Sequence, residues 1–288
     1  MMVESDEPRT TAKWAPPDGD LRDVGLHVRV LGEGQPTFLL LHGLAGSHRY
    51  FGAAFDRLSA DGRVVVPDLL GFGGSPHPDG TDYGADAHAG AVIDALDALG
   101  VKRPIHVGAH SVGTLVALRI AVRRPEWIAS VVAFGPPLYR TADEAREHIS
   151  RLGLWVRLFA METPWARAAC TWMCKHRSTA TRLAKWMRPD LPPEIACDAV
   201  QHTWGSYSGS LRNLVIGAQT AMDIVRMSVP VHLIAGEQDA VVDRAFLREL
   251  ADAYPHVRLE EWPGGHDLPL NQPERCVDAL RAAARRDV

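Results

Sequence analysis

The sequence predicts an α/β protein with a mostly parallel central sheet, helices on both faces of that sheet, and a helical insertion. Three features predict this class. From Val28 to about Pro137, short apolar runs alternate with helical patterns, as in successive strand–helix–strand units. The stretch that follows, up to Val229, has helical periodicity and almost no strand signal. Strand signals then return, so the insertion is expected to interrupt a single sheet.

The first four predicted strands are nearly continuous apolar runs, as expected where helices cover both faces of a sheet, and two further strand signals follow the insertion. Together they span residues 37–41, 64–66, 105–107, 130–134, 231–235 and 257–262. Helices are predicted at residues 85–99, 112–122, 243–253 and 271–284, the last one capped by Asn271. We therefore expect a mobile N-terminal arm (1–20), a core (21–136 and 229–288) and a helical cap (137–228).

The composition of the 288 residues is ordinary for a soluble globular protein and allows a substantial core. A net charge of −4 argues against a nucleic-acid partner, because neutralising phosphates requires a basic surface. No run approaches the roughly 18 apolar residues of a membrane span, and the N-terminus lacks a signal-peptide pattern, so we expect a cytoplasmic location. The sequence indicates no oligomeric state.

No metal and no cofactor are predicted. The four cysteines are few for the chain length and are expected to be reduced thiols. Cys170 and Cys174 are four residues apart, whereas structural zinc sites usually show tighter pairs, so buried thiols in a helical cap are the better interpretation.

The most informative local pattern is the run IHVGAHSVGT at residues 105–114, in which a predicted strand meets a predicted helix at Ser111. A serine at such a turn has a strained backbone and an exposed hydroxyl, provided that small residues flank it. Ala109 stands where a glycine is usual, and Gly113 keeps the second small position. Ser111 is therefore the candidate nucleophile.

A serine nucleophile needs a base that removes its proton and an acid that orients the base. Asp239 follows the predicted strand 231–235, and His266 follows the strand 257–262. Loops beyond the carboxyl ends of parallel strands share one edge of a sheet, so these two residues can meet Ser111 there. Among rival acids, Asp243 is interpreted as a helix cap and Asp267 as a solvated loop carboxylate.

A reaction through an acyl-enzyme also needs two N–H donors for the developing oxyanion. The candidates are the backbone N–H groups of Val112, at the start of the helix, and of Leu44, after the strand 37–41. In the predicted cap, four aromatic residues are candidates for binding a hydrophobic substrate: Trp155, Phe159, Trp204 and Tyr207. His110, next to the candidate nucleophile, is expected to have a packing or hydrogen-bonding role.

Five motifs in this order resemble the α/β-hydrolase family. They are LHGLAGS (41–47), PDLLGFGGS (67–75), AHSVG (109–113), GEQD (236–239) and GH (265–266). The resemblance implies a structural role for His42 and an oxyanion N–H from Leu44. A serine nucleophile is similar to that of esterases and lipases, whereas epoxide hydrolases and haloalkane dehalogenases have an aspartate there.

The resemblance therefore implies a cofactor-free serine hydrolase that cleaves a hydrophobic carboxylic ester, thioester or lactone. Three alternatives stay open within the same fold. They are a C–C bond hydrolase, an enzyme like the cofactor-free haloperoxidases, and a protein that binds a small molecule as a receptor. Transfer of the acyl group to an alcohol is a further variant of the same chemistry.

Overall fold

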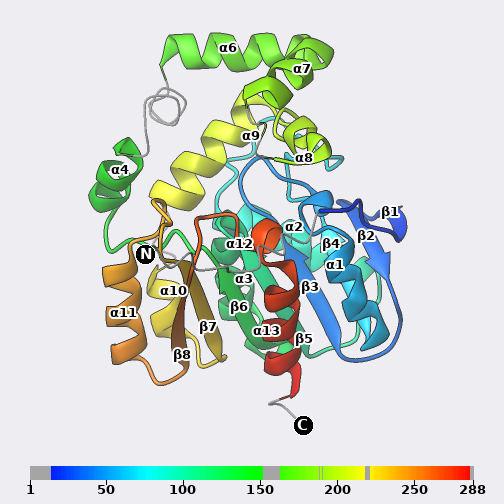
Figure 1. Ribbon diagram of the computed structural model, residues 1–288, viewed down its shortest axis with the longest axis vertical. Coiled ribbons are helices and arrows are strands. Elements are labelled where there is room, and N and C mark those ends of the chain that lie inside the picture. The colour runs from blue at the N-terminus through cyan, green and yellow to red at the C-terminus, as the bar shows by residue number, and fades with distance from the viewer. Residues whose placement is uncertain (1–13, 152–162, 188, 190, 218–220, 286–288) are drawn as a thin grey trace, which may run out of the picture.

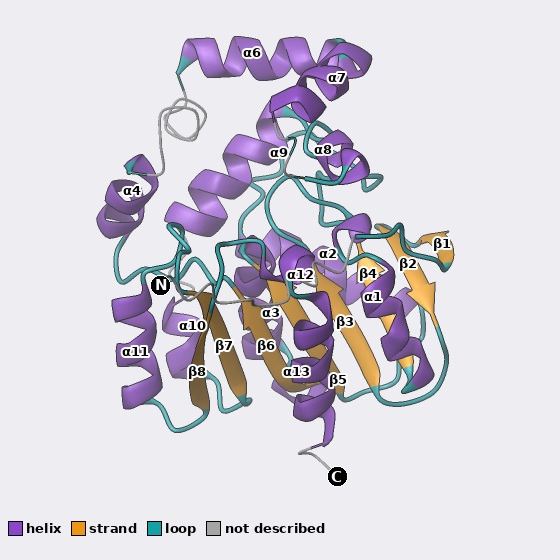
Figure 2. Cartoon of the chain, viewed as in Figure 1, coloured by secondary structure: helices purple, strands orange, loops and turns teal. Residues whose placement is uncertain are grey.

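The centre of the structure is one sheet, drawn in orange in Figure 2. The structure is a computed structural model that describes residues 14–151, 163–187, 189, 191–217 and 221–285. Within these ranges, eight strands form the sheet in the order β1-β2-β4-β3-β5-β6-β7-β8 (Figure 1). The strands are β1 (Asp20–Asp23), β2 (His27–Leu31), β3 (Thr37–Leu41), β4 (Arg63–Pro67), β5 (Ile105–His110), β6 (Ile128–Phe134), β7 (Val231–Gly236) and β8 (Val257–Trp262).

The strands from β4 to β8 in this order run parallel, and β1 and β2 add an antiparallel pair at one side. The predicted class, an α/β protein with a mostly parallel sheet, is confirmed. Because the strands are parallel, the loops after β3, β5, β7 and β8 leave the sheet at the same edge. The predicted site residues are therefore expected to lie at this carboxyl edge.

Helices cover both faces of the sheet, and alternate strand residues pack under each layer. Leu39 and Leu41 of β3 join the core beneath α2 and α3, whereas Phe38 and Leu40 join the core beneath α1 and α13. The helices around the sheet are α1 (Ala53–Asp56), α2 (Ala85–Ala98), α3 (Val112–Arg123), α11 (Arg244–Ala253), α12 (Leu268–Asn271) and α13 (Pro273–Arg285). Three short 3-10 helices connect them: η1 (His48–Tyr50), η2 (Arg57–Ala60) and η3 (Pro125–Trp127).

The segment predicted as a cap is helical and lies mainly above the carboxyl edge (Figure 1). Its described elements are α4 (Ala142–Ser150), α6 (Pro164–Lys175), α7 (Arg177–Met187), α8 (Pro193–Asp198), α9 (Trp204–Gly209), the π-helix η4 (Ser210–Ile216) and α10 (Ala221–Arg226). The last of these lies beside the sheet, where the buried Asp223 forms an ion pair with Arg119 of α3 at 2.9 Å. None of the helices in the described ranges is long and apolar enough to cross a membrane.

The predicted N-terminal arm is described only from Trp14 onward, and residues 1–13 lie outside the described ranges. Trp14 Nε1 donates a hydrogen bond to the carbonyl of Arg49 at 3.2 Å, and the N–H of Ala53 donates to the carbonyl of Ala15 at 3.0 Å. These bonds attach residues 14 and 15 to η1 and α1, and Asp20 then begins β1.

A buried carboxylate ties the cap to the loop after β3. Asp198, the last residue of α8, is 1% exposed. It accepts hydrogen bonds from Arg49 Nε at 3.0 Å, from Arg49 Nη2 and from the hydroxyl of Ser47. A buried carboxylate is costly unless its charge is paired and its oxygens are bonded, and this cluster meets both conditions. The cluster holds α8 against η1 and the loop before it.

Two buried histidines lie between the core and the cap. His88 in α2 places Nε2 3.0 Å from the hydroxyl of Ser210 in η4. His202, just before α9, forms an isolated bridge with Phe72. Burial disfavours the charged imidazolium, and it lowers the pKa of each histidine from 6.5 to about 4. Both side chains are therefore neutral at pH 7.

We expect the free energy of unfolding to fall as the pH is lowered from 6.5 to 4, the range between the ordinary and the folded pKa of these histidines. Their pKa is lower in the folded chain, so the unfolded chain binds more protons in this range and acid favours unfolding. Each histidine contributes up to roughly 3 kcal/mol to the loss.

Urea unfolding across this pH range measures the effect. His88→Gln keeps a polar partner for Ser210 but does not titrate, so it should reduce the dependence of stability on pH. The same dependence in wild type and variant would contradict the role of His88.

Candidate active site

Ser111 stands at a sharp turn between β5 and α3 at the carboxyl edge of the sheet. Its backbone has φ 49° and ψ −122°, a positive-φ conformation that residues other than glycine rarely adopt. The N–H of Ser111 donates to the carbonyl of Phe134, the last residue of β6, at 2.9 Å. This bond to the neighbouring strand holds the strained residue in place.

Close packing behind the turn requires the glycine at position 113. A Cβ on Gly113 would lie 2.4 Å from the carbonyl oxygen of Leu41 and 2.7 Å from that of His42. Both are backbone atoms at the end of β3, which cannot move without disturbing the sheet. Ala109 is accommodated in β5, where it is fully buried and pairs with Leu41 and Ala133.

We expect Gly113→Ala to lower the free energy of unfolding by about 1–3 kcal/mol, because the added methyl group overlaps backbone atoms. Gly90→Ala in α2 is the matched control. Its Cβ would meet only the end of a flexible arginine side chain at 3.5 Å, so this change should stabilise the chain by up to about 1 kcal/mol. Urea unfolding compares the two variants, and equal stabilities would contradict the packing argument.

The structure brings Ser111, His266 and Asp239 together, although up to 155 residues separate them in sequence. His266 Nε2 lies 3.0 Å from Ser111 Oγ, and His266 Nδ1 lies 2.8 Å from Asp239 Oδ2. A carboxylate only accepts hydrogen bonds, so Nδ1 carries the proton that faces Asp239. The other ring nitrogen is then free to accept the hydroxyl proton of Ser111.

The His266 side chain and a backbone N–H group favour the charged form of Asp239. Burial by itself raises the pKa of this carboxyl group, but the hydrogen bond and charge of His266 and the N–H of Val241 outweigh it, so the pKa is lowered. The Val241 N–H donates to Asp239 Oδ1 at 2.8 Å. Gly135 makes room for the pair, since a Cβ there would lie 3.0 Å from His266 Nδ1. No pattern in the sequence distinguishes Gly135 from other glycines that follow a strand.

The two candidate oxyanion donors lie beside Ser111 in the lining of one pocket. Val112 is the first residue of α3, where a helix provides no internal acceptor for the N–H group. Leu44 follows Gly43, and a Cβ added at position 43 would lie 3.2 Å from the Cβ of Ser111. His42 is fully buried and holds this loop, with Nδ1 2.7 Å from the Gly43 carbonyl and Nε2 accepting from the N–H of residue 69.

The pocket over Ser111 has a volume of about 370 Å³ and a mainly apolar lining. Residues from the cap segment contribute to it: Tyr139, Ile149, Leu191, Ile195, Ala199, Tyr207, Leu211 and Val215. Of the four predicted binding residues, Tyr207 lines the pocket and Trp204 is not among the described residues that do so. Trp155 and Phe159 lie outside the described residues.

One wall of the pocket is polar and is built by Tyr50, His110 and Asp267. The rings of Tyr50 and His110 stack with centroids 4.6 Å apart. The Tyr50 hydroxyl donates to Asp267 Oδ1 at 3.0 Å, and His110 Nε2 lies 3.1 Å from the carbonyl oxygen of His266. His110 thus packs and hydrogen-bonds, as its expected role requires. The interpretation of Asp267 as a solvated loop carboxylate is wrong, because it is partly buried and bonded to Tyr50.

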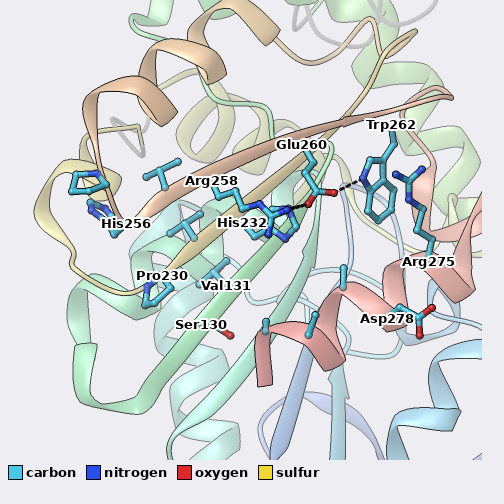
Figure 3. A pocket seen from close by; sticks show the side chains of 16 residues that line it. Ser130, Val131, Pro230, His232, His256, Arg258, Glu260, Trp262, Arg275 and Asp278 are labelled. Atoms are coloured by element: carbon cyan, nitrogen blue, oxygen red, sulfur yellow. Dashed lines mark hydrogen bonds and ion pairs between the residues drawn. The ribbon is translucent and has the colours of Figure 1, made fainter. Parts of the chain in front are cut away.

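A larger cavity, of about 770 Å³, lies on the sheet between β6, β7, β8 and α13 (Figure 3). Its polar side chains bind one another: Glu260 accepts from Trp262 Nε1 at 2.9 Å and lies 3.3 Å from His232 Nε2, and Arg275 covers the Trp262 ring. Ser111 and His266 do not line it.

One group of side chains in the described residues has the composition of a metal site. Potential ligand atoms of His27, His48 and Asp68 lie within 4.8 Å of one another. Asp68 Oδ1 already accepts from His48 Nδ1 at 2.9 Å, and Oδ2 accepts from the Gly74 N–H at 2.7 Å. These bonds fasten the loop after β4 to η1, so hydrogen bonding inside the protein accounts for the arrangement.

The fold and the site define the class: a parallel α/β sheet with a serine at a strand–helix turn and a His–Asp pair at the same edge. A family model described as "Alpha/beta hydrolase family" matches residues 38–279. The chain belongs to this family.

Relatives and solved structures agree with this membership. A protein of Arabidopsis thaliana named as a probable lysophospholipase, BODYGUARD 4, is 28% identical over 83% of this chain. The chain spans only 61% of that relative and 48% of a second one, BODYGUARD 5. A protein of Enterobacter cloacae named as a proposed carbamate hydrolase, RutD, is 28% identical, with 84% of this chain and 88% of the relative covered.

The crystal structure of E-2-(acetamidomethylene)succinate hydrolase has a TM-score of 0.73 and 20% identity to this chain, and 93% of this chain and 99% of that one are covered. The enol-lactonase of Burkholderia xenovorans LB400 has a TM-score of 0.70 and 20% identity, with 90% and 96% covered. At this identity the likeness supports the fold.

Proposed function

We propose that this chain is a serine hydrolase that cleaves a hydrophobic carboxylic ester, thioester or lactone through an acyl-enzyme. The observation that carries the proposal is the contact of His266 with both Ser111 and Asp239, at 3.0 and 2.8 Å. Ser111 has a base within hydrogen-bond distance, and that base has an acid that orients it. The cofactor-free reaction uses only these side chains and two backbone N–H groups.

In the proposed reaction, His266 Nε2 takes the proton of Ser111 as Oγ attacks the substrate carbonyl. The N–H groups of Leu44 and Val112 stabilise the oxyanion. The intermediate collapses, His266 gives its proton to the leaving alcohol, and an acyl-enzyme remains. Water then attacks the acyl group with His266 as base, which releases the acid and restores Ser111. Asp239 stays ionised throughout and holds the imidazole in the required tautomer.

The pocket supports a hydrophobic acyl group. Most of its described lining is aliphatic or aromatic, and the cap contributes much of it. A volume of about 370 Å³ suits a small substrate. The names of the relatives, a probable lysophospholipase and a proposed carbamate hydrolase, support acyl transfer to water as the reaction class.

A labelling experiment tests the proposal. A fluorophosphonate probe should modify the purified chain at Ser111, identified by mass spectrometry of the labelled peptide, and p-nitrophenyl esters of increasing chain length should be hydrolysed. Absence of both labelling and turnover, together with tight binding of a small ligand, would favour the receptor alternative. Labelling without release of the acid would favour acyl transfer to another acceptor.

A further inference from the structure

Helices α6 and α7 lie at the end of the cap that is farthest from the sheet (Figure 1). The chain as a whole has a net charge of −4, yet these two helices contain no aspartate or glutamate. Their basic residues are Arg167, Lys175, Arg177, Arg182 and Lys185. The two helices are therefore a cationic part of a protein whose excess of acidic residues lies elsewhere.

Large apolar side chains are exposed on the same two helices. The described residues include seven large hydrophobic side chains that are exposed, and four of them lie here: Trp165, Trp172, Leu183 and Trp186. Trp165 is 83% exposed and Trp186 is 79% exposed. Trp165 and Trp172 are two turns apart in α6 and so lie on one face, whereas the buried residues of this helix lie on another. Such a concentration of exposed apolar side chains indicates an interaction surface.

Four of the cations on these helices are available to a partner: Arg167, Lys175, Arg182 and Lys185 are all exposed. Within the described part of the chain, none of the four forms an ion pair. Arg177 differs, because it is partly buried and donates a hydrogen bond to Gln201. Arg182 and Lys185 are next in sequence to Leu183 and Trp186, so positive charge borders the exposed apolar side chains of α7.

The partner of this surface must accept both tryptophan rings and positive charge. A bilayer with anionic lipids meets both requirements, since tryptophan favours the level of the headgroups and anionic headgroups attract lysine and arginine. A second copy of the chain suits the surface less well, because a symmetric contact would bring cations against cations.

We propose that α6 and α7 dock this protein on the surface of an anionic bilayer. The attachment is peripheral, since no helix in the described ranges can cross a membrane. The inference goes beyond the proposed function and does not depend on it, so its test needs no turnover.

Flotation with lipid vesicles tests the proposal. The full chain is mixed with vesicles of equimolar phosphatidylcholine and phosphatidylserine, or of phosphatidylcholine alone, and centrifuged in a density gradient. The chain should float with the anionic vesicles, and it should bind the neutral ones at least about tenfold more weakly. Raising the salt concentration should weaken the binding to anionic vesicles, because salt screens exposed charges.

Two double variants separate the contributions of charge and of apolar contact. Arg182→Gln with Lys185→Gln should raise the dissociation constant for anionic vesicles about thirtyfold, at roughly fivefold for each cation. Trp165→Ala with Trp186→Ala should raise it at least about tenfold, because two rings no longer enter the headgroup region. These side chains are exposed, so circular dichroism and the midpoint of urea unfolding should not change.

The matched controls lie outside the cap. Lys102→Gln with Arg124→Gln removes two exposed cations near the opposite edge of the sheet, and Leu21→Ala removes an exposed apolar side chain from β1. Both should bind vesicles as the wild type does. A wild type that does not float with anionic vesicles, or that binds both kinds of vesicle equally, would overturn the proposal. Equal weakening in the controls and in the α6 and α7 variants would do the same.

Sedimentation velocity distinguishes the rival partner. A dimer of the wild type that is lost in the Trp165→Ala and Trp186→Ala variant, together with no binding to vesicles, would assign the surface to a second copy of the chain and overturn the proposal.

Discussion

Ser111→Ala should lower kcat/KM for p-nitrophenyl butyrate by about 10⁴-fold or more and abolish fluorophosphonate labelling. Without Oγ no acyl-enzyme can form, and His266 loses the hydroxyl group 3.0 Å away. Any remaining activity would come from direct attack of water on the bound substrate, with the N–H donors still stabilising the oxyanion. Initial rates measured over a range of substrate concentrations give kcat/KM for the wild type and the variant.

The fold should survive this change. Alanine has the same Cβ as serine, and the backbone bond from residue 111 to Phe134 is kept. Circular dichroism and the midpoint of urea unfolding check this. Ser178→Ala, at an exposed position in α7, is the matched control and should retain full activity. Wild-type turnover in Ser111→Ala would end the proposed mechanism.

Asp239→Asn should lower kcat/KM at neutral pH by about 10⁴-fold. The amide preserves the shape of the side chain and can still accept from the Val241 N–H. Its NH₂ group, however, can donate to His266 Nδ1 and so place the ring proton on Nε2. In that tautomer the histidine cannot accept the proton of Ser111. The effect should appear in kcat rather than in substrate binding.

Asp243→Asn separates this effect from a general loss of charge. Asp243 caps α11 by accepting from the N–H of Phe246 at 3.0 Å, and asparagine caps a helix equally well. We expect less than about a twofold change in activity for this variant. A larger loss in Asp243→Asn than in Asp239→Asn would reverse the assignment of the acid.

Much of the fold could be predicted because the buried parallel strands have continuous apolar runs and the helices have clear periodicity. The edge strand β1 was not predicted, since its four residues, DLRD, are all exposed and show no apolar pattern. The last helix was placed two residues too early. Asn271 ends α12, Gln272 has a non-helical backbone, and α13 begins at Pro273, which needs no acceptor for an N–H group.

The positions of Ser111, Asp239 and His266 could be inferred because each follows a strand of one parallel sheet. The polar wall of the pocket could not be inferred in the same way. Tyr50 lies in a short 3-10 helix, and its contact with Asp267 joins residues 217 positions apart. Gly135 resembles any turn glycine until its neighbours are known. Such contacts depend on how loops fold over the edge, which strand and helix patterns do not determine.

The Arg49–Asp198 ion pair limits how the entrance above Ser111 can widen. Swinging α8 outward would strip a carboxylate of its counter-charge and pull on the chain that carries the Leu44 amide. Such a movement would displace the backbone N–H groups that the proposed reaction needs. We therefore expect the cap to move about α8, which stays fixed. A substrate can then enter while the N–H donors keep their positions.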